Sequence, residues 1–149
     1  MSINVYAADS TDDGENAVLD GDYARAAKIF KPHALKGDAF AQYMLGTLYI
    51  FGQGVTQDYA EAVKLFMLAA QQGLAQAQHM LGDMYYFGRG VTQDYTLAHM
   101  WYNLSGAQGT KLSIANRDLV AKKLTPQQLT EAQKLARECV AKNYKGCGS

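Results

Sequence analysis

Residues 37–72 read GDAFAQYMLGTLYIFGQGVTQDYAEAVKLFMLAAQQ, and residues 73–108 read GLAQAQHMLGDMYYFGRGVTQDYTLAHMWYNLSGAQ. The two stretches align without a gap at an offset of 36 and are identical at 19 of 36 positions. A half-copy precedes them, because residues 21–37 match residues 57–73 in the same register. A fixed period of this length is typical of a solenoid, in which each unit buries its apolar face only against its neighbours.

Each unit predicts two helices. In the first unit we expect a helix over residues 39–51, ended by a glycine turn, and a second helix that begins at Asp58. Glu61, three residues further on, predicts a capping box with Asp58. The second unit predicts the same pair over residues 75–87 and 94–107. Strand signals are absent, so the expected fold is all-α: an α-α superhelix, or solenoid, of antiparallel helix pairs.

A glycine lies in the middle of each first helix, at Gly46 and Gly82. Glycine inside a helix costs about 1 kcal/mol relative to alanine. Its presence at the same point of both units predicts that the backbones of neighbouring helices approach closely there.

The two ends of the array need caps, because their apolar faces would otherwise contact water. We expect a tail or signal-peptide remnant followed by one solenoid domain over residues 14–149. Its parts are a half-repeat at 14–36, repeats at 37–72 and 73–108, a C-terminal cap at 109–142 and a tail at 143–149.

The C-terminal cap predicts two helices. Leu112, Ala115, Leu119 and Val120 have the spacing of the packing face of another first-type helix. The sequence Thr-Pro-Gln-Gln at residues 125–128 is a capping box with proline at the first helical position. We expect this last helix to run to about residue 142 and to lie over the second repeat.

Two cysteines are present, Cys139 and Cys147. Cys139 shares a helical stripe with Ala132 and Ala136, so one interpretation is a small buried hydrophobic residue. The interpretation that we favour is a disulfide to Cys147 across a turn at Gly146, which would contribute a little under about 3 kcal/mol. An even number of cysteines with a local pairing is typical of an oxidising compartment.

The string Val-Tyr-Ala-Ala-Asp at residues 5–9 is similar to the end of a secretory signal peptide, although the charged and apolar regions that precede such an end are absent. Two interpretations stay open for residues 1–13: the remnant of a signal peptide, or a short disordered tail. Together with the cysteines, the first interpretation predicts a periplasmic or secreted protein.

Charge and hydropathy argue against two classes of partner. Fourteen basic residues balance 14 acidic ones without a long run of either sign, whereas nucleic-acid binding proteins carry a basic face. No stretch approaches the roughly 20 apolar residues of a membrane span, so we expect no membrane insertion.

The pattern A-x-A-Q-x-M-L-G-x-x-Y-x-F-G-x-G-V-x-x-D-Y occurs at residues 39–59 and again at 75–95. It resembles the Sel-one-like repeat family, a relative of the tetratricopeptide repeats, and the resemblance extends over residues 20–140. It implies right-handed superhelical packing and a role as an adaptor in signalling, secretion or host contact. Cysteine-rich relatives tie the helices of each repeat by disulfides. The repeats here contain no cysteine, so that scheme does not transfer.

One helix face differs between the two repeats. Within the first helix, four of the differences fall at i, i+3, i+7 and i+10, which is one side of a helix. We predict that this side forms the concave surface and binds a partner, because several of its residues are aromatic. The predicted contact residues are Phe40, Tyr43, Thr47, Ile50, Gln76, His79, Asp83 and Tyr86. The alternative is a solvated face that has drifted without function.

Catalytic motifs are absent. The sequence has no S-x-x-K element with S-D-N and K-T-G, no G-x-S-x-G elbow and no phosphate-binding loop, so we expect no catalytic residue and no cofactor. His79 and Asp83 lie one helical turn apart and could share a metal ion, but a third ligand is not evident. We therefore expect no metal site.

The resulting prediction is a non-enzymatic adaptor that holds a protein or peptide segment in its groove. Two alternatives stay open. The first is a cell-wall-directed enzyme, or a protein that binds β-lactams or peptidoglycan, of the kind described among cysteine-rich relatives. The second is a structural array that self-associates through its edges, because two full repeats are near the lower limit for stability.

Overall fold

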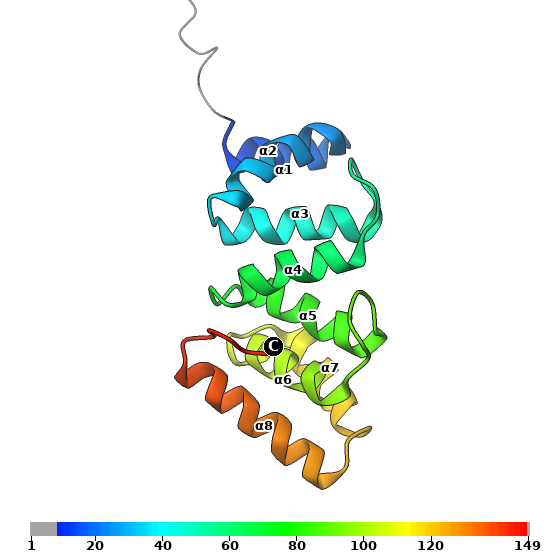
Figure 1. Cartoon of the computed structure of the whole chain (residues 1–149), viewed down its shortest axis with the longest axis vertical. Coiled ribbons are helices and arrows are strands. Elements are labelled where there is room, and N and C mark those ends of the chain that lie inside the picture. Colours follow the sequence, from blue (N-terminus) through cyan, green and yellow to red (C-terminus); the bar gives the residue numbers. More distant parts are fainter. Residues whose placement is uncertain (1–8, 149) are drawn as a thin grey trace, which may run out of the picture.

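The computed structural model describes residues 9–148, and over this range the chain is all-helical, with eight α-helices and no strand. Figure 1 shows the helices stacked in chain order into one column, with α1 and α2 at one end and α8 at the other. The fold is therefore the predicted α-solenoid. The helices are α1 (Thr11–Leu19), α2 (Tyr23–Leu35), α3 (Ala39–Phe51), α4 (Tyr59–Ala70), α5 (Ala75–Phe87), α6 (Tyr95–Ala107), α7 (Lys111–Ala121) and α8 (Pro126–Ala141).

The repeats begin and end their helices where the sequence predicts. The Asp58 carboxylate accepts a hydrogen bond from the Glu61 backbone N–H at the start of α4, and Asp94 does the same for Leu97 at the start of α6. Gly52 ends α3 in the left-handed conformation, with a φ of 61° that other residues adopt only at a cost. Local sequence signals thus determine the helix boundaries.

The predicted capping box at Asp58 is wrong in its second half. The backbone N–H of Asp58 donates to the carbonyl oxygen of Tyr49 at 3.0 Å, so it is not available to the Glu61 side chain. The Glu61 carboxylate lies 3.4 Å from the Lys64 ammonium instead. A tertiary hydrogen bond between the loop and α3 has replaced the local one.

The mid-helix glycines accommodate aromatic rings, not a neighbouring backbone as predicted. A Cβ atom on Gly46 would lie 2.7 Å from the Phe66 ring, and one on Gly82 would meet the Tyr102 ring. The close backbone approach occurs in the loops, where a Cβ on Gly54 would overlap the carbonyl of Tyr23 in the preceding unit.

The N-terminal unit contains two helices, α1 and α2, and makes one of the contacts of the full repeats. A Cβ on Gly14 in α1 would lie 2.7 Å from the Phe30 ring in α2, which is the same glycine–aromatic contact that both repeats make. The first helix begins before residue 14, the expected start of the domain, because Ser10 and Asp13 form a capping box that starts α1 at Thr11. Residues 1–8 lie outside the described range, and with them most of the signal-like string.

The C-terminal cap contains both predicted helices, but the predicted packing face of α7 is wrong at three of its four residues and correct only at Val120. Leu112 and Leu119 are 60% and 58% exposed, and Ala115 is exposed as well. Ser113 and Val120 are the buried residues of this helix. The offset of 36 explains this, because it places Leu112 and Leu119 at the positions of Gln76 and Asp83, outside the packing stripe.

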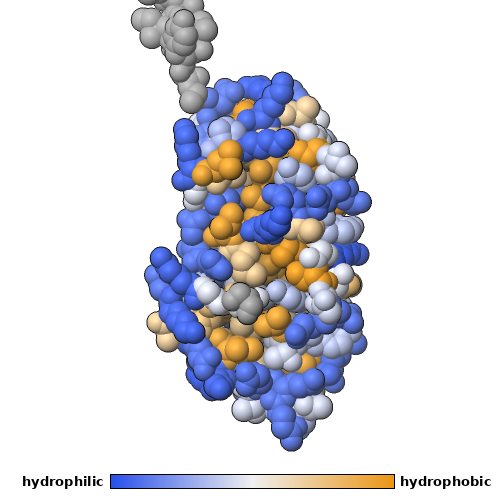
Figure 2. All heavy atoms as spheres, in the orientation of Figure 1, coloured by the Kyte–Doolittle hydropathy of each residue, from blue (hydrophilic) through white to orange (hydrophobic). Residues whose placement is uncertain are grey.

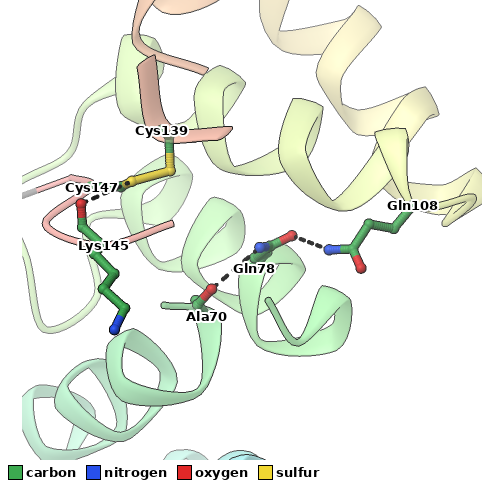
Figure 3. The surroundings of a disulfide bond; sticks show 6 residues. All are labelled: Ala70, Gln78, Gln108, Cys139, Lys145 and Cys147. Atoms are coloured by element: carbon green, nitrogen blue, oxygen red, sulfur yellow. Dashed lines mark hydrogen bonds between the residues drawn. A yellow bond between two sulfur atoms is a disulfide. The ribbon is translucent and has the colours of Figure 1, made fainter. Parts of the chain in front are cut away.

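The last helix, α8, starts as predicted and packs against α6. Thr125 and Gln128 form the capping box, with Pro126 as the first helical residue. Cys139 near its end is joined to Cys147 by a disulfide, with the two Cα atoms 5.4 Å apart (Figure 3). The disulfide holds the final segment, residues 143–148, against the second repeat.

Alternating helices give the column two sides. We call the side on which α3, α5 and α7 are neighbours the first-helix face, and the side on which α2, α4 and α6 are neighbours the second-helix face. The core between them is mainly aromatic and aliphatic, with Phe30, Phe66, Trp101 and Tyr102 buried. None of the helices in the described range is long and apolar enough to cross a membrane.

Candidate functional site

The predicted contact residues lie on α3 and α5, on the first-helix face, with one exception. Ile50 is only 7% exposed and belongs to the main core cluster, so its predicted contact with a partner is wrong. Ten residues turn an α-helix through about 1000°, which places Ile50 about 80° from Phe40 around the helix. That rotation brings it to the edge of the stripe that faces the core.

On α3 the predicted contact residues are mainly aromatic. The Tyr43 ring is half-buried, with its centroid 6.2 Å from those of both Phe40 and Phe66. The Thr47 hydroxyl donates to the carbonyl oxygen of Tyr43 at 3.0 Å, so it is already satisfied within the helix. This part of the face therefore offers ring and methyl surface.

On α5 the predicted contact residues are mainly polar, and His79 is hydrogen-bonded to α7. His79 Nδ1 lies 2.7 Å from the Ser113 hydroxyl, which donates to Ser105, whose hydroxyl donates in turn to the carbonyl oxygen of Ala75. Each serine hydroxyl has a single proton, and both protons are already used in these hydrogen bonds. Nδ1 of His79 is therefore the donor to Ser113. Nε2 of His79 then faces the Asp83 carboxylate at 3.6 Å. Gln76, one turn earlier on α5, is exposed.

Asp83 also accepts a short hydrogen bond of 2.5 Å from the Tyr102 hydroxyl. Burial raises the pKa of Tyr102 well above its ordinary value, and the hydrogen bond to the Asp83 carboxylate raises it further. Tyr102 therefore stays protonated and acts as a donor. Its hydroxyl holds the Asp83 side chain in place at the surface.

Asp83 borders a cavity of about 150 Å³ between α5 and α7, with Tyr102 of α6 in its wall. Two exposed apolar residues, Phe87 and Leu119, are part of the lining and are 55% and 58% exposed. A cavity of about this volume holds a benzene ring in another protein. The complete lining is Asp83, Tyr86, Phe87, Tyr102, Asn116, Leu119 and Val120.

Aromatic contacts support one side of the cavity. The Tyr86 ring packs edge-on against Phe87, with centroids 4.8 Å apart, and lies 5.4 Å from the Tyr95 ring. The Arg89 guanidinium lies 4.9 Å from the Phe87 ring centroid. Phe87 is therefore held in place although it is exposed.

The sequence prediction missed Phe87, Asn116 and Leu119. The last two lie on α7, whose stripe was expected to pack inward. The signal that would have found Leu119 is the repeat offset, since residue 119 is 36 positions after Asp83.

Ser113, His79 and Asp83 lie in a line that is similar to a nucleophile, a base and an acid. Ser113, however, is fully buried and donates its proton to Ser105, so its hydroxyl does not reach a substrate. Within residues 9–148 no group of three or more His, Cys, Asp or Glu side chains could hold a metal ion. The arrangement is suited to binding a side chain.

Comparison with known proteins identifies similar repeats. The model of the Sel1 repeat matches residues 39–74 and 75–110. A crystal structure of a protective antigen present in uropathogenic Escherichia coli strains, which displays an SLR fold, matches with a TM-score of 0.84 and 31% identity over 90% of this chain and 30% of that one. A Sel1 repeat protein from Oxalobacter formigenes matches with a TM-score of 0.60 and 32% identity over 61% of this chain and 26% of that one.

The chain thus spans less than a third of the length of either solved structure. No curated protein matches the sequence.

Proposed function

Because the chain contains two Sel1 repeats, which typically serve as protein-interaction scaffolds, we propose that it is a non-catalytic adaptor that binds a protein or peptide segment on its first-helix face. The single observation that carries this proposal is the cavity between α5 and α7, because it combines exposed apolar side chains with one carboxylate.

Exposed apolar residues next to a cavity are expected at a binding surface. Covering a fully exposed leucine or phenylalanine is worth about 1.5–3 kcal/mol, and Phe87 and Leu119 are each more than half exposed. The partly buried Phe40 and Tyr43 rings add apolar surface on α3, on the same face. The surface therefore supports a contact that is wider than the cavity alone.

The chemistry of the cavity indicates what the partner contributes. Its volume of about 150 Å³ fits one aliphatic or aromatic side chain. Asp83, which already accepts from Tyr102, has a further oxygen available for a cationic side chain or a backbone N–H. We propose a partner segment with an apolar anchor next to such a donor.

Site-specific crosslinking tests this proposal. A photoreactive amino acid at position 119 in the source cells is expected to capture a protein that the same residue at position 19 does not capture. Leu19 is a matched control because it is 83% exposed but lies on α1, away from the cavity. Equal capture at the two positions would contradict the proposal.

Affinity measurements on the captured partner give the quantitative test. Leu119→Glu is expected to weaken binding at least about tenfold, since it places a charge on an apolar contact, whereas Leu19→Glu should leave it unchanged. Circular dichroism of each variant checks the fold. Unchanged affinity of a folded Leu119→Glu variant would place the partner elsewhere.

We also propose that the protein works in the periplasm or outside the cell. The Cys139–Cys147 disulfide supports this, and so does the similarity to a protective antigen. Fractionation of source cells with immediate alkylation is the test: unmodified, paired cysteines in the exported fraction are expected, and alkylated cysteines in a cytoplasmic fraction would contradict the proposal.

A further inference from the structure

The second-helix face carries the same groove twice, once empty and once filled. The empty groove, of about 540 Å³, runs between α2 and α4 with α3 as its floor. Its lining includes Ala34, Leu35, Gly37, Tyr49, Leu65 and Leu68. Adding the repeat offset of 36 gives the corresponding positions one unit later, Ala70, Gln71, Gly73, Tyr85, Trp101 and Leu104.

The chain's own C-terminal segment fills the second groove. The Tyr144 ring lies over Gly73, where an added Cβ would be 3.2 Å from it. The Tyr85 hydroxyl donates to the carbonyl oxygen of Gly148 at 3.1 Å. Gly148 itself packs on the Trp101 indole, where an added Cβ would be 2.9 Å away. All three partners of the segment are counterparts of residues that line the empty groove.

The corresponding positions in the empty groove lack these contacts. A Cβ on Gly37 would meet nothing within 4 Å, so the surface on which a ring would rest is open. Leu68 is 50% exposed, whereas its counterpart Leu104 is 2% exposed in the same core cluster as both cysteines. Leu35 at the edge of the groove is 90% exposed. Leu68 is therefore left uncovered here, although its counterpart in the next unit is buried, and Leu35 adds exposed apolar surface where the next unit has Gln71.

The figures show the relation between the two sites. In Figure 1 the C-terminal end lies on the viewed side of the column in front of α5 and α6. Figure 2, in the same orientation, shows hydrophobic side chains on this side over α3 and α4, interspersed with hydrophilic ones. Figure 3 shows the disulfide and the segment near Ala70 and Gln78, which are counterparts of Ala34 and Gln42 in the lining of the empty groove.

We propose that the empty groove over α3 binds an extended peptide segment of a partner protein, with the chemistry of Tyr144–Gly148. An aromatic ring would rest on Gly37, small residues would cross Leu65, and a backbone carbonyl would accept from the Tyr49 hydroxyl. The chain's own segment does not serve this groove, because the disulfide to Cys139 ties it to α8. The site goes beyond the proposed adaptor function, which concerns the opposite face.

A synthetic peptide tests the proposal on the intact, oxidised protein. The probe is fluorescein-labelled Asn-Tyr-Lys-Gly-Ser-Gly-Ser, which copies residues 143–149 with serine in place of Cys147. Fluorescence polarisation is expected to show saturable binding with a Kd below about 1 mM. Emission of Trp101, the single tryptophan, is expected to stay unchanged on addition of unlabelled peptide, because its own groove remains filled.

Three variants locate the probe. Leu68→Glu is expected to weaken its binding at least about tenfold by placing a charge in the apolar groove. Tyr49→Phe should weaken it about fivefold through the loss of one hydrogen bond. The control Leu19→Glu, at a leucine that is 83% exposed and lies outside the groove, should have no effect. Circular dichroism checks that all three variants fold.

Each other outcome overturns the proposal. Absence of saturable binding, or binding that Leu68→Glu leaves intact, would show that the groove does not take this chemistry. A shift in Trp101 emission would show that the peptide displaces the chain's own segment from the filled groove. A reversible dimer in light scattering that Leu68→Glu dissociates would show that a second copy of the chain covers the groove.

Discussion

Gly82 determines how tightly its repeat packs, because it has no side chain. A side chain there would overlap the Tyr102 ring, whose hydroxyl holds Asp83 at the edge of the cavity. The glycine therefore connects the core to the candidate site through one aromatic ring. Gly46 and Phe66 make the same contact one repeat earlier, where no carboxylate follows.

Gly82→Ala is expected to lower the free energy of unfolding by about 1–3 kcal/mol, because the methyl group overpacks against Tyr102. This outweighs the gain of about 1 kcal/mol in helix propensity. Urea denaturation measures the change. In a Tyr102→Leu background the same substitution should become neutral or stabilising, and a stabilising effect in the native background would contradict the argument.

His99 is a second residue whose environment matters. It is 3% exposed, and its Nδ1 atom has no hydrogen-bond partner in the described part of the chain. Burial lowers the pKa of His99, and the positive charge of Arg117 lowers it further. The folded state therefore resists protonation at this residue.

Stability should fall as the pH is lowered through about 6.5, the pKa of an unfolded histidine. Below that value the unfolded chain binds a proton at His99 that the folded chain does not yet bind, until the pH reaches the lowered pKa of the folded state. The loss is at most about 1.4 kcal/mol per pH unit. His99→Val, which copies the counterpart Val63, should flatten the dependence of unfolding free energy on pH. Parallel curves for the two proteins would rule the mechanism out.

At the scale of elements, α8 and the segment after it act as one cover. The helix packs on α6, and the disulfide returns residues 143–148 to the groove beside α5. The last repeat is therefore covered by two different elements, α8 and the segment of residues 143–148. Only the first of them is a helix.

Reduction of the disulfide is expected to lower stability by about 2.5 kcal/mol in the chain-entropy model, or Tm by about 5–10 °C. Release of Gly148 from the indole should shift Trp101 emission to longer wavelength, which fluorescence measures directly. A Cys139→Ala/Cys147→Ala variant serves as the control and should not respond to the reductant. An unshifted emission after complete reduction would show that the segment stays docked without the bond.

At the scale of the whole molecule, the chain is a column of three helix pairs with α7 and α8 as its cap. Each helix from α1 to α7 packs on its neighbours in sequence, so stability is close to a sum of nearest-neighbour terms. The column presents its exposed apolar surface on both faces, at Leu119 on one and at Leu68 on the other. The two proposed sites are therefore separate, and variants in one should leave binding at the other unchanged.

Truncation after Lys122, which removes α8 and the final segment, should uncover Trp101 and Leu104. Exposing two such side chains costs about 1.5–3 kcal/mol each, so we expect a less cooperative thermal transition and binding of a hydrophobic dye. A chain truncated after Lys142 with Cys139→Ala keeps α8 and should unfold cooperatively. Equal transitions for the two truncations would contradict the role of α8 as the cap.

Helix boundaries and the repeat architecture followed from the sequence, because they depend on local signals. Asp58, Gly52 and Thr125 act on backbone groups within a few residues of themselves, and a duplicated stretch must fold twice in the same way. The disulfide was predicted for the same reason, since Cys139 and Cys147 are close in the chain.

Only the tertiary structure decided which apolar side chains stay exposed. Ile50 turned inward, and the final segment covered Trp101 while the matching groove at Leu65 stayed empty. A hydrophobic pattern states that a residue prefers burial, but burial requires a neighbour. Those neighbours come from helices and segments that lie far away in the chain. Local sequence signals do not predict which of them will pack against a given residue.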